Sequence, residues 1–256
     1  MNIFEINQEN NKKLLVTFTG EFYQPGRIYF KIFNKKSLLK IFQKLRCILF
    51  NPKNNEWIWL YDYEAQKLQF EKSYYQIPKE HRPIIIGYFR FRGDDLMILD
   101  VRSLTRLLYA VEFFGKRINP HIAKATHLRL VNKLFSETEN NQHLNQSFDL
   151  LFDQEISQPN HKEINNTIYN IFQEYPDEEE QIQALSNYID TISNDILPEI
   201  EELLIDYYTD GIDQLNFCLQ TRQIYALEHW KGNTEFSYAN LITEIMNKTL
   251  DDDELE

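Results

Sequence analysis

Residues 84–101 read IIIGYFRFRGDDLMILDV, and this stretch decides the fold of the first half of the chain. Two runs rich in β-branched, aliphatic and aromatic residues, 84–92 and 96–101, flank the turn sequence Gly93-Asp94-Asp95. Runs of this kind favour extended backbone, and glycine and aspartate favour a reversal between them. The stretch therefore predicts a β-hairpin.

Apolar and aromatic runs on both sides of this hairpin extend the sheet. Four further strands are predicted, over residues 14–19, 27–33, 56–64 and 67–75. Pro25-Gly26 marks a loop between the first two of these, which are therefore expected to form a second hairpin. Residues 126–135 fit either a strand or a helix.

Two segments carry apolar residues at the three- and four-residue spacing of amphipathic helices. The first follows Ser37, a helix-capping residue type, and runs to Leu49 before Asn51-Pro52 ends it. The second follows Ser103 and approaches its end at Gly115. The order of the elements predicts an α+β fold for residues 1–136, a mostly antiparallel sheet with two helices.

The pattern changes in the second half of the chain. It divides into a polar linker with a short helix at 137–160, an acidic all-helical bundle at 161–250 and an acidic tail at 251–256. The short helix is predicted at Phe148–Phe152, and Asp177 is expected to cap a helix of the bundle. Ile200 begins a segment expected to continue as helix up to Gly211, and a last helix is predicted over residues 238–250.

Charge is divided unevenly between the two halves. Residues 1–136 carry 23 Lys and Arg against 12 Asp and Glu, a net charge of +11, whereas residues 137–256 carry 4 against 27, a net charge of −23. This asymmetry indicates that the front half meets a polyanion such as nucleic acid, or a protein partner of opposite charge, with the acidic half masking the same cations. The same charges are also consistent with two halves that bind each other and need no external partner.

A set of cations is expected to form the polyanion-binding surface. Its members are Arg90, Arg92, Arg102, Arg106, Lys116, Arg117, Lys124 and Arg129. Arg90 and Arg92 lead the set because alternation along a strand places both on one face. Together Arg90 and Arg92 are expected to form an exposed basic stripe on that face.

Four aromatic residues alternate along one predicted strand: Trp57, Trp59, Tyr61 and Tyr63. Alternation puts all four on the same face of the sheet. Such a face either packs as a hydrophobic core beneath a helix or forms a platform on which single-stranded bases stack. Both interpretations are kept, and core packing is the favoured one.

The catalytic alternative rests on three carboxylates near the hairpin. Asp94, Asp95 and Asp100, followed by Arg102, resemble in residue type the set with which metal-dependent nucleases hold Mg²⁺ beside a phosphate. Asp94 and Asp95 are also ordinary turn residues. The chain contains no G-x-G-x-x-G, G-x-x-x-x-G-K or G-x-S-x-G motif, and its six histidines lack metal-ligand spacing. The sequence therefore favours a non-enzymatic protein without a cofactor or a metal.

The location of the protein is predicted from what the sequence lacks. The first residues do not resemble a secretory signal, and no run approaches 18 apolar residues. Cys47 and Cys218 lie far apart within apolar patterns, typical of reduced core thiols. We expect a soluble cytoplasmic protein with no membrane partner, acting as a binding or regulatory protein or as a purely structural interaction module. The oligomeric state is left open.

Overall fold

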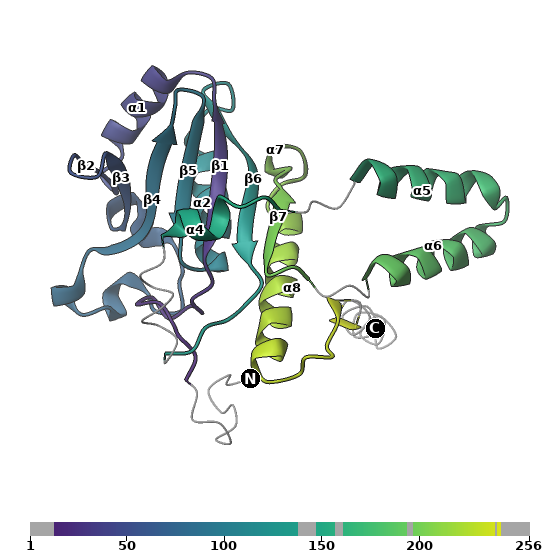
Figure 1. The fold of residues 1–256 in the computed structure, drawn as a ribbon. Coiled ribbons are helices and arrows are strands. Elements are labelled where there is room, and N and C mark those ends of the chain that lie inside the picture. The colour runs from purple at the N-terminus through teal and green to yellow at the C-terminus, as the bar shows by residue number, and fades with distance from the viewer. Residues whose placement is uncertain (1–12, 138–146, 157–160, 194–196, 239, 242–256) are drawn as a thin grey trace, which may run out of the picture.

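The computed structural model describes residues 13–137, 147–156, 161–193, 197–238 and 240–241, and a seven-stranded sheet forms its centre (Figure 1). The strands are β1 (Gly26–Ile32), β2 (Ile48–Asn51), β3 (Glu56–Tyr61), β4 (Ile84–Arg92), β5 (Leu96–Val101), β6 (Ala123–Val131) and β7 (Ile200–Leu204). Their order is β2-β3-β4-β5-β1-β6-β7, and every neighbouring pair is antiparallel. The predicted α+β class and the antiparallel sheet are confirmed.

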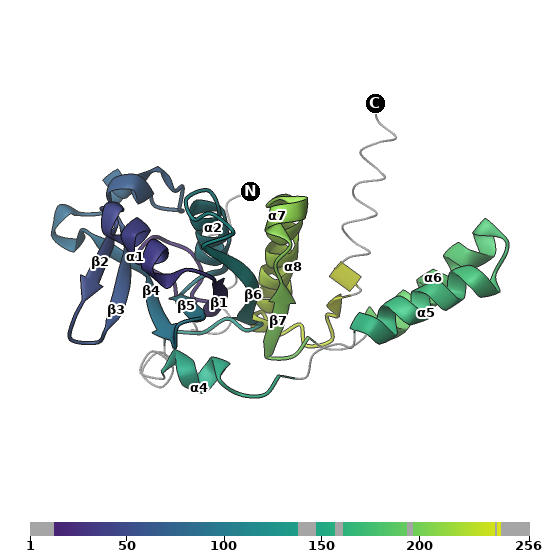
Figure 2. The same cartoon turned by 90° about the horizontal axis from the view of Figure 1, so that it is seen from above.

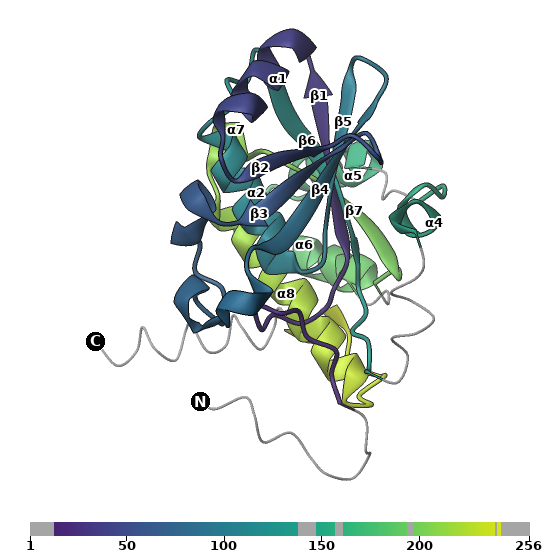
Figure 3. The same ribbon diagram turned by 90° about the vertical axis from the view of Figure 1, so that its left-hand side faces the viewer.

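Helices lie on both faces of this sheet. They are α1 (Lys35–Lys44), α2 (Leu104–Gly115), α4 (Phe148–Phe152), α5 (His161–Glu174), α6 (Glu178–Ser193), α7 (Tyr207–Asp210) and α8 (Asp213–Trp230), with 3-10 turns η1 (Tyr63–Lys67), η2 (Tyr74–Gln76) and η3 (Lys79–His81). Figures 2 and 3 show α2 and α8 on one face and α4 on the opposite face. The sheet therefore separates α4 from α2 and α8.

The main hydrophobic core fills the space between the sheet and α2. Every second residue of the central strands points into it, including Phe30 of β1 and Phe89 of β4, and α2 contributes Leu107 and Phe114. The ring centroids of Phe89 and Phe114 lie 4.9 Å apart in an edge-on arrangement, which aromatic pairs prefer. This packing leaves the alternate residues of the same strands on the other face, where α4 lies.

The hairpin that opened the prediction forms as expected. Strands β4 and β5 pair from Tyr88 opposite Asp100 to Arg92 opposite Leu96. Gly93 occupies the turn with φ of +77°, a conformation that glycine adopts without strain. Ser103 caps α2, because its hydroxyl oxygen accepts a hydrogen bond from the Arg106 backbone N–H at 3.2 Å. Both predictions are confirmed.

Three details of the front half differ from the prediction. Residues 14–19 make only isolated bridges, because β1 is already paired on both of its edges, with β5 and β6. The first helix ends at Lys44, Asn34 rather than Ser37 caps it, and the residues after it form β2. Residues 67–75 form no strand; the chain instead folds back so that the ring of Phe70 packs edge-on against Tyr61 at 4.9 Å.

The prediction of an all-helical second half is wrong at Ile200–Leu204. This segment is β7, which pairs with β6 from Ile200 opposite Val131 to Leu204 opposite His127. Apolar residues at 200, 203 and 204 fit a helix, but the free edge of β6 offers a row of unpaired backbone groups that a strand satisfies. The acidic half therefore contributes one strand to the sheet of the basic half.

The remaining helices of the second half do not form a bundle around one core. Helices α5 and α6 pack against each other and extend away from the sheet, whereas α8 packs against α2 (Figure 1). Asp177 caps α6 as predicted, accepting a hydrogen bond from the Glu180 backbone N–H at 3.2 Å. The helix predicted over 238–250 and the acidic tail fall almost wholly outside the described residues. Within the part of the chain described, no helix combines the length and apolar character needed to cross a membrane.

Candidate functional site

A row of paired residues crosses the sheet on the face that carries α4. From β2 to β7 the partners are Leu49, Ile58, Tyr88, Asp100, Arg27, Arg129 and Glu202. The row is apolar at the β2 side and ionic from β5 onward. Because residues two apart on a strand share a face, Arg90 and Arg92 of β4 lie on this same face.

Arg27 and Asp100 form the floor of the ionic part. The Arg27 Nε atom lies 2.6 Å from Asp100 Oδ1, and its Nη2 donates to Asp100 Oδ2 at 3.1 Å. The side chain of Arg27 is 0% exposed and that of Asp100 is 3% exposed. Arg90 also donates to Asp100 Oδ2, at 2.6 Å. One buried carboxylate is therefore shared by two guanidinium groups.

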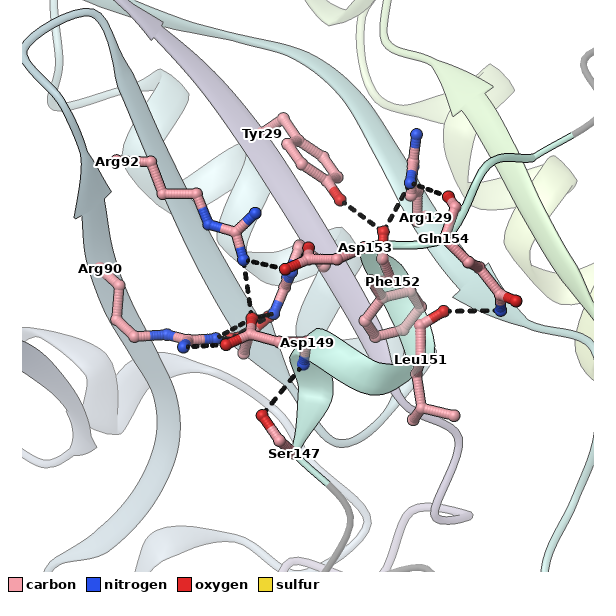
Figure 4. A network of polar contacts seen from close by, with 12 residues as sticks. Tyr29, Arg90, Arg92, Arg129, Ser147, Asp149, Leu151, Phe152, Asp153 and Gln154 are labelled. Atoms are coloured by element: carbon pink, nitrogen blue, oxygen red, sulfur yellow. Dashed lines mark hydrogen bonds and ion pairs between the residues drawn. The ribbon is translucent and has the colours of Figure 1, made fainter.

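Helix α4, together with its C-cap residue Asp153, supplies two more carboxylates to the same guanidinium groups (Figure 4). Asp149 accepts from Arg27 at 2.7 Å, from both Nη atoms of Arg90 at 2.8 and 2.9 Å, and from Arg92 at 2.7 Å. Asp153 accepts from Arg27 at 2.7 Å and from Arg92 at 2.6 Å. We name these five residues together with Asp100 the arginine cluster.

The charges of the arginine cluster balance only when α4 is in place. Three guanidinium groups face three carboxylates, and two of those carboxylates belong to α4. Without α4 the sheet would present three cations around Asp100 alone, a surplus of two positive charges. Separating buried or half-buried arginines from carboxylates is costly, so the sheet face requires two negative charges from α4 or from a substitute.

The pKa values of the cluster follow from these contacts. Hydrogen bonds from Arg90, and then from Arg27, hold the pKa of Asp149 far below its usual value although burial acts in the opposite direction. Burial on its own would lower the pKa of Arg27, but its hydrogen bond to Asp100, the charge of Asp100 and its hydrogen bond to Asp149 raise the pKa above its usual value. Both groups therefore remain charged throughout the physiological range.

The backbone end of α4 is held separately from its carboxylates. Arg129 Nη1 donates to the carbonyl oxygens of Phe152 and Gln154 at 2.5 and 3.1 Å, and the Tyr29 hydroxyl donates to Phe152 O at 3.4 Å. At the other end, the Ser147 hydroxyl oxygen accepts a hydrogen bond from the Asp149 backbone N–H. The last carbonyls of a helix lack partners within the helix, so Arg129 satisfies the last carbonyl of α4, that of Phe152, and also the carbonyl of Gln154 just beyond the helix.

One side chain of α4 is fully buried. Phe152 is 0% exposed and packs with Leu15, Tyr23, Val131 and Phe135 in a small second core. The guanidinium carbon of Arg27 lies 5.4 Å from the centre of the Phe152 ring, within the range of a cation–π contact. Leu150, on the outer side of α4, is 72% exposed. The helix is therefore attached by the Phe152 ring, by the partly buried Phe148 and Leu151, by two carboxylates and by carbonyl groups near its end.

The structure brings together three of the eight predicted cations. Arg90, Arg92 and Arg129 contact α4, whereas Arg106 is buried on the opposite face and pairs with Glu21 at 3.0 Å. The other four do not join the site: Arg102 and Lys124 are exposed, Lys116 pairs with Glu112, and Arg117 lies over Phe113. The predicted basic stripe is therefore a compact cluster around Arg27, a residue absent from the predicted set.

The predicted carboxylates do not form a metal site. Asp94 is exposed and pairs with Lys35 at 2.9 Å, Asp95 is exposed, and Asp100 is neutralised by Arg27 and Arg90. Arg102 points elsewhere, since its side chain is exposed. Across the described ranges, no group of three or more His, Cys, Asp or Glu residues is placed to hold a metal ion.

The four predicted aromatic residues do not form one exposed platform. Trp59 and Tyr61 are 0% exposed in the main core. Trp57 is partly buried between Phe42 and Phe50, and Tyr63 lies in η1 under the guanidinium of Arg46. The favoured interpretation, a core packed beneath helices, matches the burial of Trp59 and Tyr61.

Sequence reasoning missed Arg27, Asp149 and Asp153. A usable signal for the two aspartates was present: Asp149 and Asp153 stand four residues apart within SFDLLFD, which places both on one side of a helix. Arg27 alternates with Tyr29 and Lys31 along a strand whose other positions are apolar, which marks one polar sheet face. No local signal connects the two segments, because their contact spans 122 residues of chain.

No known family model, curated protein or solved structure matches this chain. The class of protein is therefore described from the structure alone: an antiparallel α+β protein with an arginine cluster on one sheet face, which a short acidic helix covers.

Proposed function

We propose that this chain is a non-enzymatic cytoplasmic binding or regulatory protein, whose arginine cluster binds an anionic partner and whose acidic segment α4 covers that cluster. The observation that supports the proposal is the placement of Asp149 and Asp153 on Arg27, Arg90 and Arg92. The acidic half would thus regulate the basic half through the predicted linker helix.

The covering helix is suited to being displaced. A five-residue helix is not stable in isolation, and its docking rests on a small set of contacts. Burial of the Phe152 side chain contributes about 2 kcal/mol. The ion pairs of Asp149 and Asp153 with Arg90 and Arg92 are about one-third exposed on both sides, and pairs of that kind add roughly 1 kcal/mol each at most. Their pairs with the buried Arg27 are costly to break unless another anion takes their place. A partner that makes these contacts and further ones on the same sheet face could replace α4.

The competing interpretation is that the halves bind each other permanently. Arg129 pairs with Glu202 of β7 at 2.8 Å, so the acidic half also neutralises a cation without α4. In that case α4 would be a fixed part of the fold. The two interpretations differ in whether uncovering the arginine cluster exposes a binding surface.

The test compares the full chain with the variant Asp149→Asn plus Asp153→Asn, which keeps the shape of both side chains and removes two negative charges. The matched control is Asp94→Asn plus Asp95→Asn, which removes the same charge from an exposed turn outside the cluster. Binding of polyglutamate and of a single-stranded oligonucleotide is measured by fluorescence anisotropy at two salt concentrations. We expect the cluster variant to bind one of these probes about tenfold more tightly than the control, with affinity falling as salt rises. Equal binding by the two variants contradicts the proposal.

A further inference from the structure

We propose that the anionic partner is a protein that inserts a short acidic helix, with two carboxylates four residues apart and an aromatic residue beside the second, in the place of α4. This inference rests on the proposed function and names the partner class of the same site. It is carried by three features of the site that each fit a helix and that lie side by side on the sheet.

The first feature is the spacing of the guanidinium donors. Arg27 uses its two Nη atoms on two different carboxylates, Asp149 and Asp153. The Nη2 of Arg92 donates to the same two carboxylates, at 2.7 and 2.6 Å. Two carboxylates must therefore lie close together, as residues four apart on one helix do. The rigid fork of arginine makes this a geometric requirement as well as an electrostatic one.

The second feature is recognition of the end of a helix. Arg129 donates to the carbonyl groups of Phe152 and Gln154, and Tyr29 donates to the first of these. Carbonyls at a helix C-terminus carry a partial negative charge and lack internal partners. A peptide that ends its helix at this position satisfies Arg129 with its backbone, whatever its side chains.

The third feature is an apolar socket. Leu15, Tyr23, Val131 and Phe135 surround the ring of Phe152, and the rings of Tyr23 and Phe135 meet edge-on at 5.6 Å. The socket adjoins the cluster directly, since Arg27 contacts both the ring and its neighbouring carboxylate. An aromatic side chain next to an acidic one is therefore the sequence that fits.

Nucleic acid fits these features less well. A nucleic-acid strand is commonly bound by cations that follow its backbone and by aromatic rings that stack its bases. Arg106 is buried on the far face, and Lys116 and Arg117 follow α2 on that side, so these predicted cations do not continue the cluster. Trp59 and Tyr61 are buried under the same far face. The site instead supplies a compact pair of anion positions, a helix end and one ring socket.

The experiment uses a fluorescent peptide of residues 147–156, SFDLLFDQEI, added to the full chain carrying Asp149→Asn and Asp153→Asn. The control peptide has Asp153 and Gln154 exchanged, which keeps composition, charge and the apolar residues Phe148, Leu151 and Phe152 in place but moves the second carboxylate about 100° around the helix. A single-stranded oligonucleotide is the third probe. We expect the first peptide to bind at least tenfold more tightly than the exchanged peptide and the oligonucleotide.

Three outcomes separate this inference from the proposed function. Equal binding of the two peptides shows that charge alone is read and overturns the inference, while the proposed function stands. Tighter binding of the oligonucleotide assigns the cluster to nucleic acid and also overturns the inference alone. No binding of any probe by a folded variant contradicts both. If circular dichroism shows the double variant to be unfolded, the single variant Asp153→Asn is used with the same three probes and the same criteria.

Discussion

The energetic coupling between Asp100 and α4 tests whether α4 covers the arginine cluster in solution. Asp100 comes from the sheet and Asp149 and Asp153 come from α4, yet all three contact the buried Arg27. The perturbation is Asp100→Asn, measured once in the native chain and once in the chain carrying Asp149→Asn plus Asp153→Asn. The two backgrounds form a double-mutant cycle.

The structure sets the expected magnitudes. Leaving a buried charge without its partner costs about 3–5 kcal/mol. In the native chain, Asp100→Asn leaves Arg27 with two carboxylates and also removes the repulsion between Asp100 and the α4 aspartates, so we expect a loss of about 2 kcal/mol. In the α4 variant, the same change leaves Arg27 with no carboxylate among its described contacts, and we expect a loss of about 3–4 kcal/mol. The double change is therefore expected to cost roughly 1–2 kcal/mol more than the sum of its parts, because Asp100 and the α4 aspartates can each substitute for the other on Arg27.

Urea unfolding monitored by circular dichroism and by tryptophan fluorescence measures the four free energies of unfolding. The control cycle replaces the α4 pair by Asp94→Asn plus Asp95→Asn, for which we expect Asp100→Asn to cost the same as in the native chain. Coupling within about 0.5 kcal/mol of zero in the α4 cycle would show that α4 does not share Arg27 with Asp100 in solution. The covered arginine cluster, and the function built on it, would then be refuted.

Three further predictions concern single groups. Phe152→Ala empties the apolar socket, and we expect faster proteolysis within residues 147–156 while the amides of β4 and β5 stay protected in hydrogen exchange. Equal loss of protection in both regions would contradict the idea that α4 leaves the sheet without unfolding it. Asp149 faces Arg27, Arg90, Arg92, Asp100 and Asp153, and the arginines lower its pKa on folding, so its stabilising contribution is complete above about pH 4 and is lost as pH falls through the folded-state pKa. The difference in unfolding free energy between the native chain and Asp149→Asn should therefore be constant from pH 5 to 8 and shrink below pH 4. A change in that difference between pH 5 and 8 counts against the assignment. Burial raises the pKa of Cys47 to about 12, so a thiol reagent at pH 8 should label the half-buried Cys218 first and Cys47 only after unfolding, which mass spectrometry of the labelled peptides will decide.

The sheet was predictable where local pattern and long-range pairing agree. The β4–β5 hairpin joins two strongly extended runs by a tight turn, so the information lies within 18 residues. Ile200–Leu204 was not predictable in this way, since its apolar spacing suits a helix and its strand form depends on the edge of β6. The aromatic residues of 67–75 led to the prediction of a strand. In the structure their segment is a loop, and the ring of Phe70 covers the core from that loop.

Some residues of the site could be predicted from the sequence, but the contacts between them could not. The charge asymmetry and the shared face of Arg90 and Arg92 follow from counting and from strand alternation. The acidic helical domain was predicted to mask the cations, whereas the carboxylates that contact the arginine cluster, Asp149 and Asp153, come from the linker segment. Net charge describes a whole segment, but the contact depends on which two carboxylates reach Arg27, and that is decided by the path of the chain across the sheet.

A tethered α4 sets the condition under which a partner could act. A segment joined to its own site by a short linker competes at an effective concentration of about millimolar, so an identical peptide in solution would displace it poorly. A successful partner therefore needs contacts that α4 does not make. The cross-strand row provides them: beyond the arginine cluster it continues through Tyr88 and Ile58 to Leu49, which is 54% exposed. A partner helix longer than the five residues of α4 could pair with the arginines and also cover this apolar part of the sheet. Each large apolar side chain buried there adds about 2 kcal/mol to the binding free energy, or roughly 30-fold in affinity. Under the proposed function, the short α4 would therefore exclude weak anions from the arginine cluster and be displaced by a ligand that carries the same charges and a larger apolar face.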